Sequence, residues 1–365
     1  MSRFLWPVLV LAVAVGPAAT AVKLSKPDRI PAEPTAEQVT LVREGVALHD
    51  KGDYIGAMAK YKQVLDQNPW EATALHELAF TYFTSENYQG ALDTARLGAQ
   101  CQSRLLPAFY AMMGNALDEL GKGTEAIVTY KAAIKLNPRM GLLHYNLAIS
   151  LRRAGEQQEA KAAVEAGIEC DPNHASSHGL LAEIYRDLGY RIPAIMAYSR
   201  FLVLEPASAR SAQMRESLQK LMAQGASVGD KPGSINIFMS EPPKGRQDEG
   251  DFMPTELAMS MAFALTLGEK PDATKKPPES EYQKLTTAYR MLGELLDHPR
   301  SKTGFATTYY APYFAALTKA GHAEAFAAYA WQGGKVEGAS DWATANQSKI
   351  EAFLAWSKAY EWPTK

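Results

Sequence analysis

The residues best suited to catalysis or metal binding are few in this chain of 365 residues, which has seven histidines and two cysteines. They fall into no familiar pattern: H-E-x-x-H, paired C-x-x-C, G-x-x-x-x-G-K-S/T and G-x-S-x-G are all absent. His76-Glu77 lacks the second histidine, four residues after the first, that a zinc site on a helix needs. His322 and Glu324 lie at a predicted turn, where helix capping explains them as well as catalysis does. The sequence predicts no cofactor, metal site or enzyme activity, although catalytic residues assembled from distant positions would leave no local motif.

The elements that would position such residues must agree with the composition. Hydrophobic residues make up 47% of the chain and charged residues 21%, which is typical of a folded globular protein and excludes general disorder. The 38 basic and 40 acidic residues leave a formal net charge of −2. A nucleic-acid-binding surface needs an excess of positive charge, so we expect no nucleic-acid partner.

The first residues have the layout of a targeting segment. Residues 4–19 are uncharged and mostly apolar, follow Arg3, and lead into the small residues Ala19-Thr20-Ala21. We therefore predict a signal peptide over residues 1–21, cleaved after Ala21, and a protein that is exported to the periplasm or secreted and not inserted in a membrane after cleavage. An uncleaved N-terminal membrane anchor is the alternative, which Pro7 disfavours. Residues 22–37 are predicted to be a flexible leader.

An internal repeat of 34 or 35 residues runs from residue 38 to residue 207. One alanine recurs in every repeat, at Ala57, Ala91, Ala126, Ala160 and Ala194. A small residue also recurs earlier in each repeat, at Gly45, Ala79, Gly114, Ala148 and Ala182. Turn residues separate two helical segments within a repeat, and a proline closes four of the five repeats. The predicted repeats are 38–71, 72–106, 107–140, 141–174 and 175–207, with an amphipathic capping helix at 208–223 that would seal the last interface.

This pattern resembles the tetratricopeptide repeat family, whose unit is a helix-turn-helix of 34 residues. The resemblance covers the repeats at 38–207, within a predicted domain of residues 38–225 that includes the capping helix. It implies an all-α fold, a right-handed α-α superhelix of about five repeats, continued by a C-terminal helical region. Small residues such as Gly114 would let two helices approach closely, with Tyr130 filling the gap beside them. The chain departs from the family where a tryptophan is preferred, at Leu41, Leu75, Tyr110, His144 and His178. One extra residue after the second repeat predicts an irregular turn around 102–107, either a small hinge or a tolerated insertion.

In this family the first helices of the repeats line a concave groove that holds peptides or helices of partner proteins. The resemblance therefore implies a non-enzymatic scaffold or adaptor that binds a protein or peptide partner. Carried over position by position, the groove candidates are His76, Phe80, Phe83, Asn115, Asp118, Tyr145, Asn146, Ile149, Arg152, Arg153, Glu183 and Arg186. Apolar side chains that point into a groove need a cover. The cover of Phe80, Phe83, Tyr145 and Ile149 is either a bound partner or the C-terminal segment, unless these residues pack between helices.

The charged candidates leave two alternatives. Arg152, Arg153 and Arg186 could favour an acidic peptide, because guanidinium groups match carboxylates. Glu183, however, lies three residues before Arg186 on the same helical face and can neutralise it. A solvated face of mixed charge is therefore the favoured interpretation.

The two cysteines and two of the histidines are assigned structural positions by the repeats. Cys101 and Cys170 fall at equivalent points two repeats apart. Stacked helices with interaxial distances of about 8–10 Å would place them beyond the roughly 7 Å between Cα atoms that a disulfide allows. We predict no intramolecular disulfide, although an exported protein meets an oxidising compartment. His144 and His178 fall within the repeat interfaces.

Residues 226–365 carry no recognised family signature. Alternation around Ile235 and Ile237 predicts a short strand without an evident partner strand. Helices are predicted at 255–267, which is apolar nearly all round and therefore expected to be buried, at 281–297, as a hairpin over 304–332, and at 348–361. This region either braces the superhelix or, as the alternative function, is a small enzyme or ligand-binding domain with its site in 226–365. The sequence does not indicate the oligomeric state.

Overall fold

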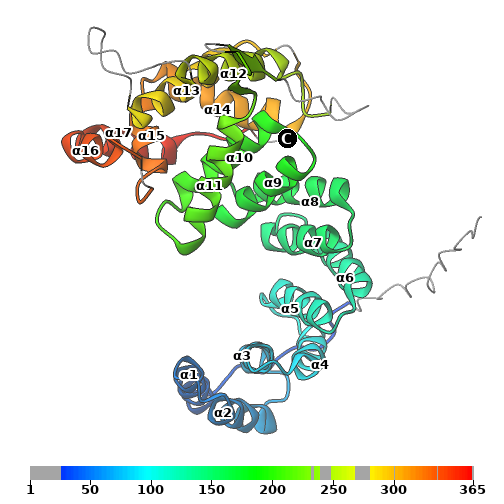
Figure 1. Ribbon diagram of the computed structural model, residues 1–365. Helices are drawn as coiled ribbons and strands as arrows, with labels where there is room; N and C mark the ends of the chain where they lie inside the picture. Colours follow the sequence, from blue (N-terminus) through cyan, green and yellow to red (C-terminus); the bar gives the residue numbers. More distant parts are fainter. Residues whose placement is uncertain are drawn as a thin grey trace, which may run out of the picture. The chain divides into compact units, whose positions relative to one another are not determined.

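The computed structural model describes residues 26–231, 234–238, 248–267, 280–299, 301–334 and 336–363. The described residues form seventeen α-helices, a short π-helical turn and one two-stranded sheet, which confirms the all-α prediction (Figure 1). Two compact units contain them, one ending at Asn137 and the other beginning at Pro138. The predicted signal peptide lies outside the described residues. None of the described helices has both the length and the hydropathy needed to cross a bilayer.

The first unit consists of three helix pairs that correspond to the first three predicted repeats. The pairs are α1 (Ala36–Asp50) with α2 (Tyr54–Gln67), α3 (Ala72–Thr84) with α4 (Tyr88–Gly98), and α5 (Leu106–Glu119) with α6 (Gly123–Leu136). The small residues allow the close approach within a pair, because a Cβ added at Gly114 would lie 2.3 Å from the ring of Tyr130. Gly45 faces Tyr61 in the same way. The periodic small-plus-aromatic pattern therefore fixes the packing of each pair.

The segment before α1 is ordered against the first unit, although the sequence predicts a flexible leader there. Arg29 forms a parallel β-bridge with Cys101, and its carbonyl accepts a hydrogen bond from the Gln102 amide at 2.7 Å. Its guanidinium also lies 5.0 Å from the centre of the Trp70 ring. Cys101 belongs to the irregular turn between α4 and α5. The lengthened turn thus supplies the backbone groups that hold the leader, which neither of the two predicted interpretations included.

The second unit begins with the last two repeats and the predicted capping helix. These are α7 (Gly141–Arg153) with α8 (Gln157–Cys170), α9 (Ala175–Asp187) with α10 (Arg191–Leu204), and α11 (Ala209–Ala223). His144 and His178 replace the usual tryptophan and make the same bond: each Nε2 donates to a proline carbonyl, at 2.9 Å to Pro138 and 3.0 Å to Pro172. Each histidine therefore ties its helix to the proline that closes the preceding repeat.

The rest of the second unit is C-terminal to residue 225. Its elements are β1 (Ala226–Val228), β2 (Ile235–Ile237), α12 (Met253–Leu267), α13 (Glu281–Leu296), η1 (Ala306–Tyr310), α14 (Ala311–Lys319), α15 (Ala323–Ala330), α16 (Ala339–Ala345) and α17 (Gln347–Ala359). The predicted strand does have a partner, because β1 and β2 pair antiparallel with Ala226 opposite Ile237. Helix α16 was not predicted.

Helix α12 is only partly buried, which corrects the expectation from its apolar composition. Met259 is buried on one side, whereas Met253, Leu257 and Met261 remain 38–50% exposed. The reason is that the β1–β2 hairpin, α11 and α13 pack against α12 without enclosing it. An all-round apolar helix thus has an exposed apolar side here.

Helix α10 is the centre of the second unit. Every residue from Arg191 to Val203 is buried, because α9 and α11 pack on one side and α12, η1 and α15 on the other. Ser199 Oγ lies 3.0 Å from the Tyr289 hydroxyl of α13. Arg200 donates to Ser357 of α17 at 3.1 Å and stacks over the Trp362 ring at 4.9 Å. The C-terminal region therefore packs as a layer on the last repeat and extends its core (Figure 1).

Candidate functional site

The candidates in the first unit include a partly exposed aromatic surface on α1, α3 and the start of α4. Phe80 and Phe83 lie three residues apart on α3, so they share one helical face. The Phe80 side chain is 42% exposed and stacks on the His49 ring, with 5.0 Å between the ring centres. Phe83 meets the Tyr88 ring edge-on at 5.3 Å. We call His49, Phe80, Phe83 and Tyr88 the aromatic surface.

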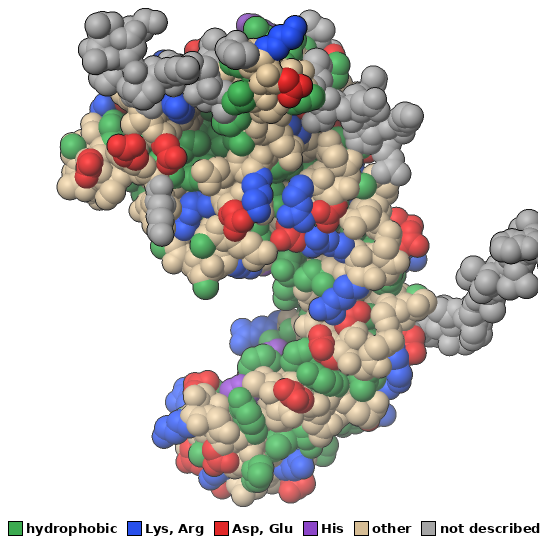
Figure 2. All heavy atoms as spheres, viewed as in Figure 1, with side chains coloured by type: hydrophobic (Ala, Val, Ile, Leu, Met, Phe, Trp, Pro, Cys, Tyr) green, Lys and Arg blue, Asp and Glu red, His purple; other side chains and the backbone are tan. Residues whose placement is uncertain are grey.

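The aromatic surface is held in place by its neighbours. His49 Nδ1 lies 2.8 Å from Thr81 Oγ1, which fixes the ring on which Phe80 stacks. Figure 2 shows hydrophobic side chains exposed beside histidines on the first unit. Aromatic rings that are both exposed and fixed lose little conformational entropy when a partner covers them. This surface is therefore suited to binding.

The remaining candidates of the first unit are engaged within it. Asn115 Oδ1 accepts a hydrogen bond of 2.6 Å from the Tyr130 hydroxyl, which links α5 to α6. Asp118 is half-buried and has an interaction of its own within the protein. His76 Nδ1 lies 3.2 Å from Glu77 Oε1, with its ring near Phe109. These side chains therefore stabilise the first unit and are not free to bind a partner without losing contacts.

In the second unit, the charged candidates neutralise one another. Arg152 of α7 donates to Glu183 at 2.5 Å and to Asp187 at 3.0 Å, both on α9. Burial alone would lower the pKa of the Arg152 guanidinium, but these two carboxylates outweigh it and raise the pKa. Arg186 pairs with Asp187 at 2.7 Å and donates to the Tyr198 hydroxyl at 3.1 Å. Glu183 was expected to neutralise Arg186, and its charge is one of those that favour the charged form of Arg186. Its hydrogen bond, however, comes from Arg152.

The other four candidates of α7 have different surroundings. Tyr145 meets the His174 ring edge-on, with 4.9 Å between the centres, and Ile149 is half-buried. Asn146 is half-buried and engaged within the protein. Arg153 is exposed and also has an interaction of its own. Figure 2 shows acidic and basic side chains alternating over the part of the second unit that contains α9 and α11.

A buried ionic cluster joins repeat four to the segment before α12, and sequence reasoning missed it. Lys161 donates to Glu249 and, at 2.6 Å, to Asp248; the side chains of Lys161 and Glu249 are 8% and 2% exposed. Glu249 Oε2 accepts from the Tyr185 hydroxyl at 3.0 Å and from the Ala306 amide at 2.9 Å. Both oxygens of the Glu249 carboxylate therefore accept hydrogen bonds, and the cluster anchors the segment before α12.

Glu165 adds a protonatable group to this ionic cluster. Burial and the neighbouring Glu249 raise the pKa of the Glu165 carboxyl well above its ordinary range. The sequence did contain a signal, because the equivalent positions of the first three repeats hold the exposed cations Lys62, Arg96 and Lys131. The fourth repeat thus has an acid, Glu165, where the first three have an exposed cation. It is also the repeat whose second helix is covered by the segment that contains Glu249.

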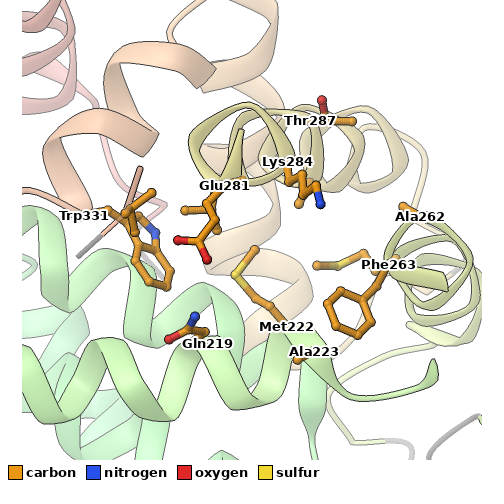
Figure 3. Close-up of a pocket in the computed structure, with 13 residues that line it drawn as sticks. Gln219, Met222, Ala223, Ala262, Phe263, Glu281, Lys284, Thr287 and Trp331 are labelled. Atoms are coloured by element: carbon orange, nitrogen blue, oxygen red, sulfur yellow. The ribbon is translucent and has the colours of Figure 1, made fainter. Parts of the chain in front are cut away.

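Sequence reasoning also missed a cavity of about 350 Å³ in the second unit. Its walls come from α11, α12 and α13, with Trp331 closing one side (Figure 3). Most of its lining is apolar. Among the described residues no group of three or more histidine, cysteine or acidic side chains is arranged to hold a metal ion. Cys101 and Cys170 are both free thiols.

The comparisons with known proteins agree with the geometry of the helix pairs. The family model described as tetratricopeptide repeat matches residues 119–184. This chain contains tetratricopeptide repeats. The TPR repeat-containing thioredoxin TTL4 of Arabidopsis thaliana is 34% identical over 76 residues, 21% of this chain and 11% of that protein. The TPR repeat-containing protein MJ1428 of Methanocaldococcus jannaschii is 29% identical over 119 residues, 33% of this chain and 21% of that protein. The chain thus spans only a small part of each relative.

Solved tetratricopeptide repeat structures match about half of the chain. The Thermus thermophilus protein TTC0263 is 22% identical with a TM-score of 0.42, covering 51% of this chain and 98% of that one. The protein YrrB, described as having an unusual peptide-binding site, is 20% identical with a TM-score of 0.38, covering 50% of this chain and 92% of that one. The tetratricopeptide repeat fold is that of a protein–protein interaction scaffold, and proteins of this family are generally not catalytic.

Proposed function

We propose that this tetratricopeptide repeat protein is an exported, non-enzymatic adaptor that binds a segment of a partner protein on its first helices. The main contact is the aromatic surface, His49, Phe80, Phe83 and Tyr88. The observation that carries the proposal is that the Phe80 side chain is 42% exposed while its ring stacks on His49. The His49 ring is in turn held by its hydrogen bond with Thr81. Aromatic residues fixed in this way dominate the energetics of many protein interfaces.

The charge pattern supports recognition by apolar contact. Arg152 and Arg186 are paired with Glu183 and Asp187, so they offer little net positive charge to an acidic peptide. The whole chain carries a net charge of only −2. Shape and apolar contact therefore contribute more to affinity than electrostatic attraction, and binding should depend only weakly on salt.

Export rests on the first residues of the sequence. The apolar stretch 4–19 after Arg3, followed by Ala19-Thr20-Ala21, supports a cleaved signal peptide. The N-terminal sequence of the protein recovered from cell fractions tests this part of the proposal. A recovered chain that starts at Val22 supports export, and a chain retained in the cytoplasm with residues 1–21 intact contradicts it.

The binding proposal is tested by photo-crosslinking and by substitution. A photoreactive phenylalanine analogue at position 80 identifies the partner, and the affinity of that partner is then measured for Phe80→Ala/Phe83→Ala. We expect the affinity to fall by at least tenfold, since buried aromatic anchors each contribute about 1–2 kcal/mol or more. The matched control is Ile55→Ala/Leu136→Ala, which removes apolar side chains 81% and 55% exposed on the second helices α2 and α6. Equal affinity of the two double variants would refute this placement of the site.

A further inference from the structure

The cavity between α11, α12 and α13 has the features of a small-molecule site. Its volume of about 350 Å³ falls in the range of ligand pockets, roughly 300–1,000 Å³. Five side chains supply most of its apolar wall, namely Met222, Met259, Phe263, Leu285 and Trp331. Met259 and Trp331 are buried, whereas the other three are half-buried around the opening. No described side chain of the protein itself fills this space.

The wall is built on fixed elements. The Trp331 indole Nε1 donates to the Tyr289 hydroxyl at 3.3 Å, and that hydroxyl also meets Ser199 of the buried helix α10. The cavity therefore rests on the core of the last repeat. Met222 faces the cavity from α11 (Figure 3). Met259 of the neighbouring helix α12 also lines it. Methionine side chains adapt to an apolar ligand without a fixed shape, such as an alkyl chain.

The polar residues of the lining are Gln219, Glu281, Lys284 and Thr287. Glu281 and Gln219 lie toward Trp331, whereas Lys284 lies on the side of Phe263 (Figure 3). Glu281 and Gln219 are exposed to water, but Lys284 is half-buried. Neither Lys284 nor Glu281 forms an ion pair with another described residue. Lys284 is thus the half-buried charged residue of this rim, and its ammonium is the group that the carboxylate of a bound ligand would meet.

We propose that this cavity binds an unbranched apolar chain that ends in a carboxylate, such as a fatty acid. The alkyl chain lies among Met222, Met259, Phe263, Leu285 and Trp331. The carboxylate pairs with Lys284, on the side of the opening away from Glu281. The site is independent of the aromatic surface in the first unit, so either proposal can fail without the other.

The first experiment places the ligand. The full chain is labelled with ¹³C at the methionine methyl groups and titrated with decanoate. The methyl signals of Met222 and Met259 should shift, while those of Met112 and Met113 on α5 serve as internal controls and should not. Unchanged Met222 and Met259 signals, or equal shifts at all four residues, would overturn the proposal.

The second experiment tests the charge. Decanoate, decanol and decylamine are titrated by calorimetry against the unmodified chain and against Lys284→Met. We expect Lys284→Met to weaken decanoate binding roughly tenfold, the effect of losing one charge-assisted hydrogen bond, and to leave decanol binding unchanged. Lys358→Met, an exposed residue of α17 that does not line the cavity, is the matched control and should change neither.

Substitution of the acidic rim residue, Glu281, tests whether the head group of the ligand is an anion or a cation. Glu281→Gln should leave decanoate binding unchanged or tighten it. If decylamine binds more tightly than decanoate and Glu281→Gln abolishes that binding, the site takes a cation and our assignment is wrong. Ala288→Phe, which fills the cavity, should abolish binding of both decanoate and decanol. If that variant fails to fold, the difference between decanoate and decanol in Lys284→Met still decides the proposal.

Discussion

Helices α4 and α10 are the second helices of two repeats built on the same template, yet their surroundings differ completely. Ala91 and Ala194 occupy the same repeat position, and both are fully buried. Two and five residues later, α4 has the exposed residues Asp93 and Arg96. The equivalent residues of α10 are Met196 and Ser199, and both are fully buried.

This difference separates what the repeat template fixes from what it leaves free. The inner face of a second helix contains the small residue that the partner helix must approach, and that residue is alanine in both repeats. The outer face has no such constraint and follows its neighbours. In α4 it meets water, whereas in α10 it meets α12, α15 and η1 of the C-terminal region. The residue types on the outer face of a second helix therefore indicate whether the C-terminal region covers that repeat.

Exchanging residues between the two outer faces tests this comparison most severely. Met196→Asp gives α10 the residue of α4 and buries a carboxylate without a counter-ion, which should destabilise the second unit by more than about 4 kcal/mol. The reciprocal Asp93→Met should change the free energy of unfolding by no more than about 0.5 kcal/mol, because the side chain stays in water. Urea unfolding of the full chain, with hydrogen exchange of α10 and α4, measures both.

Met196→Leu is the control for size, since a volume-conserving substitution in a core costs less than about 1.5 kcal/mol. If Met196→Asp were as mild as Asp93→Met, the outer face of α10 would be accessible to water. The C-terminal region would then not cover the last repeat.

The ion pairs of the two units give the second contrast. Lys161 and Glu249 have side chains 8% and 2% exposed, whereas Lys60 and Glu44 of the first unit, 2.7 Å apart, are 32% and 49% exposed. Lys161→Met leaves a buried carboxylate unpaired and should cost about 3–5 kcal/mol. Lys60→Met should cost no more than about 1 kcal/mol. Thermal unfolding measures both variants.

The double variant Lys161→Met/Glu249→Leu removes both charges and sharpens this contrast. It should recover part of the stability that Lys161→Met loses, because no charge remains unpaired at that bond. A double variant less stable than Lys161→Met would show that Glu249 acts mainly through Tyr185 and Ala306.

The repeats could be predicted from the sequence because their determinants are local. The spacing of Gly114 and Tyr130 places the two in contact wherever the helix pair forms. The covering layer could not be predicted, since its bonds join residues far apart in the chain, such as Lys161 with Glu249 and Arg200 with Trp362. No periodicity connects such positions.

The candidate site could be predicted only in part for the same reason. Repeat positions identified the helix faces, and they placed Phe80 on an exposed face. Spacing along one helix predicts the electrostatic effect of Glu183 on Arg186, which is present, but it does not predict the hydrogen bond that Arg152 of the adjacent helix donates to Glu183. The cavity depends on how α11, α12 and α13 meet, and none of these contacts has a sequence signature.

The pH dependence of stability provides a third test of the covered repeat. Burial, with Arg200 nearby, lowers the pKa of His178 to about 3. Its Nε2 proton is donated to Pro172, and Nδ1 faces the Tyr310 hydroxyl at 2.6 Å, so the neutral ring is fully satisfied. Below its ordinary pKa of 6.5 the unfolded chain binds a proton that the folded chain does not. The contribution of His178 to stability should therefore fall as the pH drops from 6.5 toward 3, by up to about 1.4 kcal/mol per pH unit.

Two variants separate this contribution from that of Glu165, which has the opposite sign. The raised pKa of Glu165, about 8 against an ordinary 4.5, means that the folded chain keeps a proton that the unfolded chain loses, so this contribution decreases stability as the pH rises from 4.5 toward 8. The two contributions oppose each other between pH 4.5 and 6.5. His178→Gln should therefore flatten the profile below pH 4.5, and Glu165→Gln should flatten it above pH 6.5. A His178→Gln profile parallel to that of the unmodified chain would show that another group causes the acid sensitivity.

Buried tyrosine hydroxyls provide the smallest and most closely matched comparison. The Tyr289 hydroxyl meets both Ser199 and Trp331, whereas the buried Tyr110 hydroxyl of α5 has no hydrogen-bond partner among the described residues. Tyr289→Phe leaves two buried polar groups without that partner and should cost about 1–2 kcal/mol, while Tyr110→Phe removes an unsatisfied hydroxyl and should be neutral or slightly stabilising. Urea unfolding resolves differences of this size. Equal effects would mean that the hydroxyl network joining α10 to α13 and Trp331 contributes nothing beyond packing, and that apolar contact alone holds the covering layer on the last repeat.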